Sequence, residues 1–215
     1  MQNLKLKHLL AIRWFHWINF PLLFLMIWSG ILIYWAYSPY HIGSFHFFPA
    51  WFVATFHTDH RLADGMALHF TLMWLFVLNG VAYVVYTLVS GEWKYLVPKS
   101  FSAFRDAWDV VLHDLGMRQT APPQEKYNAA QQISYTAIVV MGVGSVITGL
   151  AIYKPAQLAW LTALCGGYTM ARLIHFTLTI GYVLFFVVHV AQVIRAGWNN
   201  FRSMVIGYEM ADEQK

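Results

Sequence analysis

The sequence predicts an all-α integral membrane protein, a bundle of four transmembrane helices. Its 215 residues are 59% hydrophobic and only 11% charged, whereas roughly a quarter of the residues of a soluble domain are charged. The apolar residues gather in four long stretches whose central parts carry no charge. Because lipid offers the backbone no hydrogen bonds, and four strands are too few to close a barrel, these stretches are expected to be helices.

Each stretch reaches the roughly 20 apolar residues that a helix needs to cross a bilayer. The expected spans are Trp14–Tyr37, Ala63–Val89, Ile133–Tyr153 and Leu173–Ile194. The first is too long for a signal peptide, and no small-residue cleavage site follows it, so it is expected to remain as a span. With no internal repeat or second domain in view, residues 1–215 are expected to form a single membrane domain.

The basic residues are divided unevenly between the two sides of the membrane. Eleven of the 14 Lys and Arg residues precede span one, lie between spans two and three, or follow span four. Only Arg61, Lys154 and Arg172 lie in the other two loops. Since basic residues gather in cytoplasmic loops, both termini are expected in the cytoplasm and the protein in the bacterial inner membrane.

Two of the connections have features of their own. In the cytoplasmic loop, Ser100–Gly116 repeats apolar residues at helical spacing, which predicts an amphipathic helix on the membrane or under the bundle. Its apolar residues are Phe101, Phe104, Trp108, Val111, Leu112 and Leu115. The outer loop between spans one and two is aromatic and contains proline, and it is expected to pack at the interface or on a partner.

Four histidines lie inside the expected spans. His175 and His189 are fourteen residues apart in span four, which puts them on one face of a helix and roughly 21 Å apart along its axis. His16 begins span one on the inner side, and His69 begins span two on the outer side. The four therefore sort by depth into an inner couple, His16 with His189, and an outer couple, His69 with His175.

This arrangement suits two haem groups, each held between helices by two imidazoles. Neutral imidazole is a common metal ligand, and an ionisable group at bilayer depth is a functional candidate. The propionates of a porphyrin need cations at the nearest interface. Arg13 lies one turn from His16, Arg172 lies one turn from His175, and Arg61 is also on the outer side, so these three are candidate haem-binding residues.

Other interpretations of the histidines exist. Any one of the four could be a hydrogen-bonded packing residue. A zinc or copper site would need three or four ligands converging in one place, whereas these come in twos. The outer-loop histidines are expected to be solvated, although HTDH, with His57 and His60, could bind a metal.

At these residues the chain resembles the bacterial di-haem cytochrome b family, broadly termed cytochrome b561-like. That family includes the membrane subunits of nickel–iron hydrogenases and formate dehydrogenases. The motif RWFHW in span one, a histidine early in span two and H-x13-H in span four carry the resemblance, which covers nearly the whole chain. It implies the same ligands: His16 with His189 for an inner haem b, and His69 with His175 for an outer one.

Within the family, the sequence is most similar to a subgroup whose members partner extracytoplasmic molybdopterin oxidoreductases of the sulfite-oxidase-like type. The similar segments are RWFHWINFPLLFLMIWSGILIYWA, SGEWKYLVP and HVAQVIRAGWNNFR. The outer loop is long for the hydrogenase and formate dehydrogenase relatives, and this departure argues against their partners for this chain.

The resemblance also implies a quinone site near the inner haem. KYNAAQQ, residues 126–132, is similar to the family's entry into span three, and Asn128 and Gln131 there could hydrogen-bond the quinone carbonyls. Alternatively, Asn128 caps the helix of span three, an ordinary use of Asn. The two roles are compatible.

The leading hypothesis is thus an electron-transfer subunit that links the quinone pool to an extracytoplasmic redox partner. One alternative is a self-contained quinone oxidoreductase that takes electrons from a small diffusible reductant such as superoxide. Another is a histidine-based metal permease, which would be expected to carry more intramembrane acids and broken helices.

Overall fold

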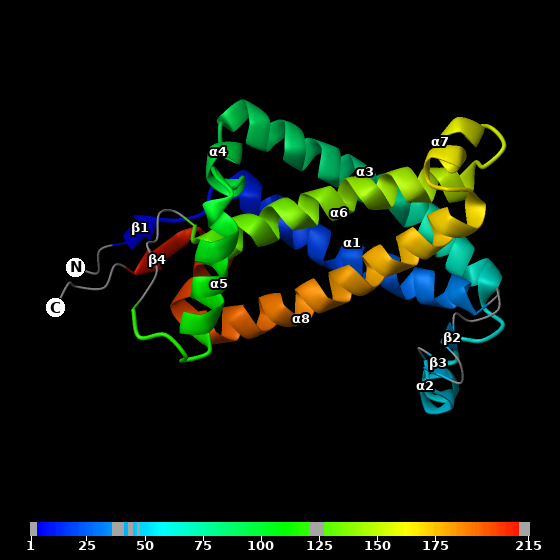
Figure 1. Ribbon diagram of the computed structural model, residues 1–215, viewed down its shortest axis with the longest axis horizontal. Coiled ribbons are helices and arrows are strands. Elements are labelled where there is room, and N and C mark those ends of the chain that lie inside the picture. The colour runs from blue at the N-terminus through cyan, green and yellow to red at the C-terminus, as the bar shows by residue number, and fades with distance from the viewer. Residues whose placement is uncertain (1–3, 36–40, 43–44, 47, 121–126, 211–215) are drawn as a thin grey trace. The chain divides into compact units, whose positions relative to one another are not determined.

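The computed structural model describes the chain except for residues 1–3, 36–40, 43–44, 47, 121–126 and 211–215. Helices dominate, and the short strands lie near the ends of the spans (Figure 1). The elements, in chain order, are β1 (Leu4–Leu6), α1 (Leu10–Tyr34), β2 (His41–Ile42), β3 (Phe45–His46), α2 (Ala50–Phe56), α3 (Leu62–Ser90), α4 (Trp93–Leu96), α5 (Ser102–Asp114), α6 (Ala129–Tyr153), α7 (Ala159–Leu164), α8 (Tyr168–Ile206) and β4 (Tyr208–Met210).

Four helices, α1, α3, α6 and α8, are long and apolar enough to cross a membrane. The predicted all-α membrane fold with four spans is therefore confirmed. The predicted bounds were too short at several ends: α1 and α6 each begin four residues earlier, and α8 continues to Ile206 through a break at Gly197. Hydropathy marks only the part of a helix that lies in lipid, whereas its hydrogen bonding continues into the interface. Residues 36 and 37 of the first predicted span lie outside the described residues.

The chain packs into two compact units. The first comprises residues 1–83 and 199–215, and the second comprises residues 84–198. The first thus holds α1, most of α3 and the end of α8, and the second holds α6 and most of α8. The expected single membrane domain stays a prediction.

In the first unit, α1 and α3 touch where α3 has no side chain. A Cβ placed on Gly65 would lie 2.8 Å from the Cβ of Leu32 and 3.1 Å from the backbone nitrogen of Ile33. Further along the same pair, the Asn79 side chain donates to the carbonyl of Phe15 at 3.4 Å. Glycine therefore sets the distance between these two helices.

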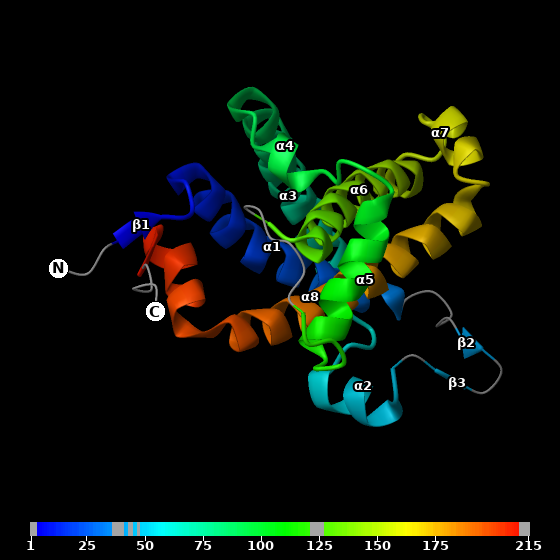
Figure 2. The ribbon, with the colours of Figure 1, turned by 60° about the vertical axis from the view of Figure 1, so that its left-hand side comes forward.

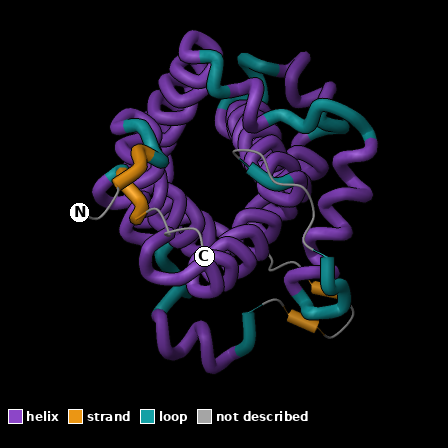
Figure 3. Tube along the Cα trace, turned by 90° about the vertical axis from the view of Figure 1, so that its left-hand side faces the viewer, coloured by secondary structure: helices purple, strands orange, loops and turns teal. Residues whose placement is uncertain are grey.

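The two ends of the chain are joined within the first unit. Strand β1 pairs antiparallel with β4, as Figure 3 shows beside the two termini. Lys7 donates to the carboxylate of Glu209 at 2.6 Å, and the indole of Trp17 donates to the carbonyl of Met204 at 3.0 Å. The N- and C-terminal segments therefore lie on one side of the membrane.

In the second unit, α6 packs against α8 through small residues. A Cβ on Gly144 would lie 3.2 Å from Leu178, and one on Gly181 would lie 2.8 Å from Met141. At the α7 end of this pair, the fully buried Ala151 and Ala171 pack with Leu161. Contacts this close require a small residue on one of the two helices at each of these points, and Gly144, Gly181, Ala151 and Ala171 supply it.

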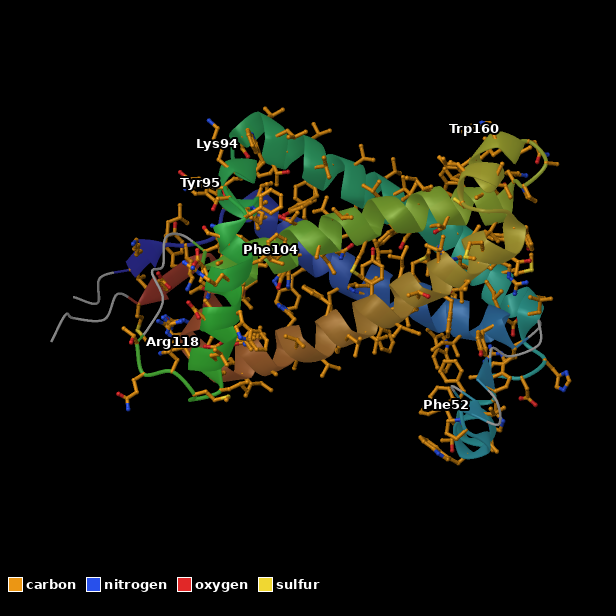
Figure 4. All side chains as sticks on the ribbon, viewed as in Figure 1. Phe52, Lys94, Tyr95, Phe104, Arg118 and Trp160 are labelled. Atoms are coloured by element: carbon orange, nitrogen blue, oxygen red, sulfur yellow. The ribbon has the colours of Figure 1, made fainter. Side chains whose placement is uncertain are left out.

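The predicted amphipathic helix forms as α5 and packs on α6 in the second unit (Figure 2). Its small and β-branched residues Ala103 and Val110 are buried, whereas its aromatic residues face outward: Phe104 and Trp108 are each about 60% exposed. Figure 4 marks Phe104 on this helix. Exposed aromatic side chains are typical of a helix at the lipid–water interface.

Between α1 and α3, β2 pairs antiparallel with β3, and α2 follows. Phe52, labelled in Figure 4, lies between Phe48 and Phe56 with ring centroids 5.1 and 4.7 Å away. Phe56 in turn contacts Trp28 of α1 edge-on at 6.0 Å. The aromatic residues of this loop therefore form a cluster that reaches the end of a span.

We expect Gly65→Ala to destabilise the protein by about 1–3 kcal/mol, because the new Cβ meets the backbone of α1, which cannot move aside. Thermal unfolding of the detergent-purified protein measures the effect. Gly80→Ala on the same helix is the control, since its Cβ would meet nothing within 4 Å. Equal melting temperatures for the two variants would contradict the assigned role of Gly65.

Candidate functional site

His69 is held by a hydroxyl on the neighbouring helix of the first unit. Its Nδ1 lies 2.9 Å from the Oγ of Ser29 on α1, and Ser29 is fully buried. The Ser29 hydroxyl also lies 3.0 Å from the carbonyl of Met26, and the imidazole itself hydrogen-bonds the backbone of Met26. The residue after Ser29 is Gly30, where a Cβ would stand 3.9 Å from the Cε1 of His69.

The second unit repeats this arrangement around His175. Its Nδ1 lies 2.9 Å from the Oγ1 of Thr148 on α6, and Thr148 is 3% exposed. The Thr148 hydroxyl lies 2.7 Å from the carbonyl of Gly144. Again the next residue is a glycine, Gly149, where a Cβ would stand 3.4 Å from the Cε1 of the histidine.

The two remaining intramembrane histidines contact aromatic rings. His16 on α1 meets Trp17 edge-on, with centroids 5.1 Å apart. His189 on α8 stacks on Phe185, one turn earlier, with centroids 5.6 Å apart and planes 9° from parallel. His175 and His189 share one uninterrupted stretch of α8, because the break at Gly197 lies beyond both.

The structure places His16 and His69 in the first unit, and His175 and His189 in the second. Each predicted couple therefore takes one histidine from each unit. The pairing of His16 with His189, and of His69 with His175, stays a prediction that rests on depth and on the resemblance.

The three candidate propionate partners differ in their surroundings. Arg61 pairs with Asp64 at 3.0 Å on the surface, and Arg172 lies over the ring of Tyr168, 5.8 Å from its centroid. Arg13 donates through one terminal nitrogen to the carbonyl of Val205 at 2.5 Å. Its Nε is buried and has no hydrogen-bond partner among the described residues. Arg13 is thus the member of this set with an unused buried donor.

A second arginine of the first unit was missed in the sequence. The Nε of Arg202 is also buried without a hydrogen-bond partner in the part of the chain that the structure describes. In sequence, a basic residue beyond the end of a span indicates only topology. Arg202 lies beyond the break at Gly197, in the part of α8 that belongs to the first unit.

The amides at the start of α6 form a reciprocal capping box. The Asn128 Oδ1 accepts from the backbone N–H of Gln131 at 2.9 Å, and the Gln131 Oε1 accepts from the backbone N–H of Asn128 at 3.0 Å. The capping role of Asn128 is therefore confirmed. Because both side-chain oxygens are used in the cap, the two NH₂ groups are the donors that could face a quinone carbonyl.

The donor set around His69 and His175 fits an axial ligand of a haem. Axial ligation needs the Nε2 lone pair, which is available when Nδ1 carries the proton and donates it elsewhere. The buried hydroxyls lie at Nδ1 in both cases. Among the described residues, no group of three or more His, Cys, Asp and Glu side chains lies close enough to hold a metal ion.

Comparison with known proteins agrees with these features. The family model of the prokaryotic cytochrome b561 matches residues 7–207. A relative from Azospira oryzae, provisionally named protein-methionine-sulfoxide reductase subunit YedZ1, is 31% identical over 180 residues, which cover 83% of this chain and 85% of the relative. The resemblance seen in the sequence is therefore confirmed. The chain belongs to the prokaryotic cytochrome b561 family and is a multi-pass inner-membrane cytochrome of the b type, an electron-transfer subunit.

Proposed function

We propose that the protein is a di-haem subunit that moves electrons between the quinone pool and an extracytoplasmic oxidoreductase. The observation that carries the proposal is the matched setting of His69 and His175, each with Nδ1 held by a buried hydroxyl and a glycine beside the ring. A hydroxyl at Nδ1 fixes the ring and suits the tautomer whose lone pair lies on Nε2, the atom that binds haem iron. One such setting in each unit supports haem ligation by both histidines.

The ligands of the inner haem would be His16 and His189, and those of the outer haem would be His69 and His175. Bound haem b supplies reversible one-electron chemistry at iron, whose potential the ligands and their surroundings adjust. The protein's part is to fix the imidazole rings, exclude water from them, and hold the two sites at different depths. On α8 the ligands stand roughly 21 Å apart along the axis, which brings the two macrocycles within the membrane thickness.

The propionates of the inner haem would meet Arg13 and Arg202. Both side chains have a buried Nε without a partner among the described residues, and a buried cationic donor is costly unless an anion satisfies it. On the outer side, Arg172 and Arg61 are the candidates. Arg61 would have to share its charge with Asp64.

The quinone would bind beside the start of α6, near the inner haem. The capping box fixes the side chains of Asn128 and Gln131 and leaves their NH₂ groups as donors. Amides held rigidly at a helix start can orient a quinone carbonyl without any change of charge.

The redox partner would be an extracytoplasmic molybdopterin oxidoreductase that docks on the outer face. The provisional name of the Azospira oryzae relative, a subunit of a protein-methionine-sulfoxide reductase, favours a partner that reduces methionine sulfoxide in proteins. In that case quinol would be the electron donor and the partner the acceptor, and the haem groups that would be held by His16 with His189 and by His69 with His175 would supply the one-electron chemistry between them. The aromatic cluster of the outer loop, with Trp51 66% exposed, supplies a contact surface.

We expect the purified protein to hold two low-spin haem b groups per chain, measured as pyridine haemochrome against protein. His16→Ala or His189→Ala should each lose one haem, and His69→Ala or His175→Ala should each lose the other. Double variants within a couple should lose no more than either single variant, because both ligands serve one iron. One haem per chain in the wild type, or additive losses within a couple, would contradict the assignment.

The capping and quinone roles of Asn128 can be separated. Asn128→Ser keeps a capping oxygen but removes the NH₂ group, so we expect normal stability and slower reduction of the haems by a quinol analogue. Asn128→Ala should in addition lower the free energy of unfolding by about 1 kcal/mol. Wild-type quinol kinetics in Asn128→Ser would remove this residue from the quinone site.

We expect both termini to be cytoplasmic, because the basic residues gather on that side. Alkaline phosphatase, which needs disulfides formed outside the cytoplasm, should be active when fused after Lys154 and inactive when fused after Met210. The reverse pattern of activities would place the termini outside and overturn the inner and outer assignments of the haems.

A further inference from the structure

Ser29 and Thr148 share a geometry that goes beyond helix packing. Each hydroxyl oxygen lies 2.9 Å from the Nδ1 of a histidine on another helix. Each also lies near a backbone carbonyl of its own helix, that of Met26 at 3.0 Å for Ser29 and that of Gly144 at 2.7 Å for Thr148. The imidazole, the hydroxyl and the carbonyl thus form a chain of three groups in both units.

The direction of hydrogen bonding along this chain follows from the proton count. A carbonyl oxygen has no proton, so the short contact between it and the hydroxyl requires the hydroxyl hydrogen to lie between the two oxygens. A hydroxyl has only one hydrogen. With the hydroxyl hydrogen so engaged, the imidazole tautomer that completes the three-group chain carries its proton on Nδ1, and Nδ1–H donates to the hydroxyl oxygen. This leaves the lone pair on Nε2.

Because the site is buried, water cannot easily replace the hydroxyl that contacts Nδ1. Ser29 is fully buried and Thr148 is 3% exposed, inside helices apolar enough to span a membrane. With the hydroxyl removed, an apolar side chain would face Nδ1. For His69, the backbone of Met26 would remain as a second partner, so the larger effect is expected at His175.

We propose that Ser29 and Thr148 are positioning residues that set the tautomer of His69 and His175 and lower the reduction potential of the outer haem. This rests on the proposed function, in which both histidines bind that haem. An imidazole that donates from Nδ1 is a more basic ligand through Nε2, and a more basic ligand stabilises ferric over ferrous iron. Both axial ligands of one iron would be adjusted in the same direction.

The test is a redox titration of the full-length protein in detergent, followed by the optical spectra of the two haems. Thr148→Val removes the hydroxyl at constant shape, and Ser29→Ala removes only the oxygen. Thr148→Ser and Ser29→Thr keep the hydroxyl and should restore the wild-type values. If loss of the hydrogen bond weakens imidazole binding to ferric iron tenfold relative to ferrous iron, the reduction potential rises by about 59 mV.

Two threonines serve as matched controls: Thr71 lies two residues after His69, and Thr177 lies two residues after His175. The Thr71 hydroxyl donates to the Ala67 carbonyl at 2.8 Å, and the Thr177 hydroxyl donates to the Leu173 carbonyl at 2.9 Å. Thr71→Val and Thr177→Val should leave both potentials unchanged. The unshifted potential of the inner haem serves as an internal control for folding in every variant.

The expected result is a higher potential for the outer haem in Thr148→Val, a smaller rise in Ser29→Ala, and the largest rise in the double variant. Loss of the outer haem alone, reversed in Thr148→Ser, would also support the proposal. Three outcomes would overturn the proposal. The potentials could be unchanged in both variants, or the control variants could show equal shifts. The third is loss of both haems in Thr148→Ser as well as in Thr148→Val. The proposed function fails separately, if His69→Ala and His175→Ala keep every haem of the wild type.

Discussion

The structure depends on one constraint: a polar ring inside a membrane must find its hydrogen bonds within the protein. His69 and His175 meet this constraint through the buried hydroxyls of Ser29 and Thr148, each on a different helix from its histidine. These contacts join α1 to α3 and α6 to α8, and they suit the imidazole tautomer that carries its proton on Nδ1. One pair of hydrogen bonds therefore contributes both to helix association and to the chemistry of the candidate ligands.

Small residues make these contacts possible. On α6, Gly144, Thr148 and Ala151 recur at the spacing of one helical face, and all three meet α8 or the segment that leads into it. On α1, Ser29 and Leu32 share a face in the same way, and Leu32 lies against Gly65 of α3. Because no apolar driving force pulls helices together in lipid, close approach through small side chains supplies the packing energy. The same approach brings a hydroxyl within reach of an imidazole, so the packing face and the candidate site coincide.

Each unit has polar groups of its own. In the first, the buried Nε atoms of Arg13 and Arg202 provide donors for anionic groups, and an aromatic cluster packs against α1. In the second, the capping box at the start of α6 fixes two amide side chains, and the exposed aromatic side chains of α5 suit the lipid interface. A hydroxyl–imidazole pair lies in each unit.

The sequence by itself determined the class of the fold, the four spans, the amphipathic helix and the helix cap, because each depends on local composition or spacing. Lipid requires long apolar helices, and an Asn three residues before a Gln, just ahead of an apolar run, is a signature of a helix cap. It also indicated the four histidines, since imidazoles are rare inside spans. Only the tertiary structure revealed Ser29, Thr148 and Arg202. Serine, threonine and arginine are common residues whose roles come from what lies opposite them. Helix packing decides what lies opposite each of these side chains, and the sequence alone does not show which residues of two helices meet.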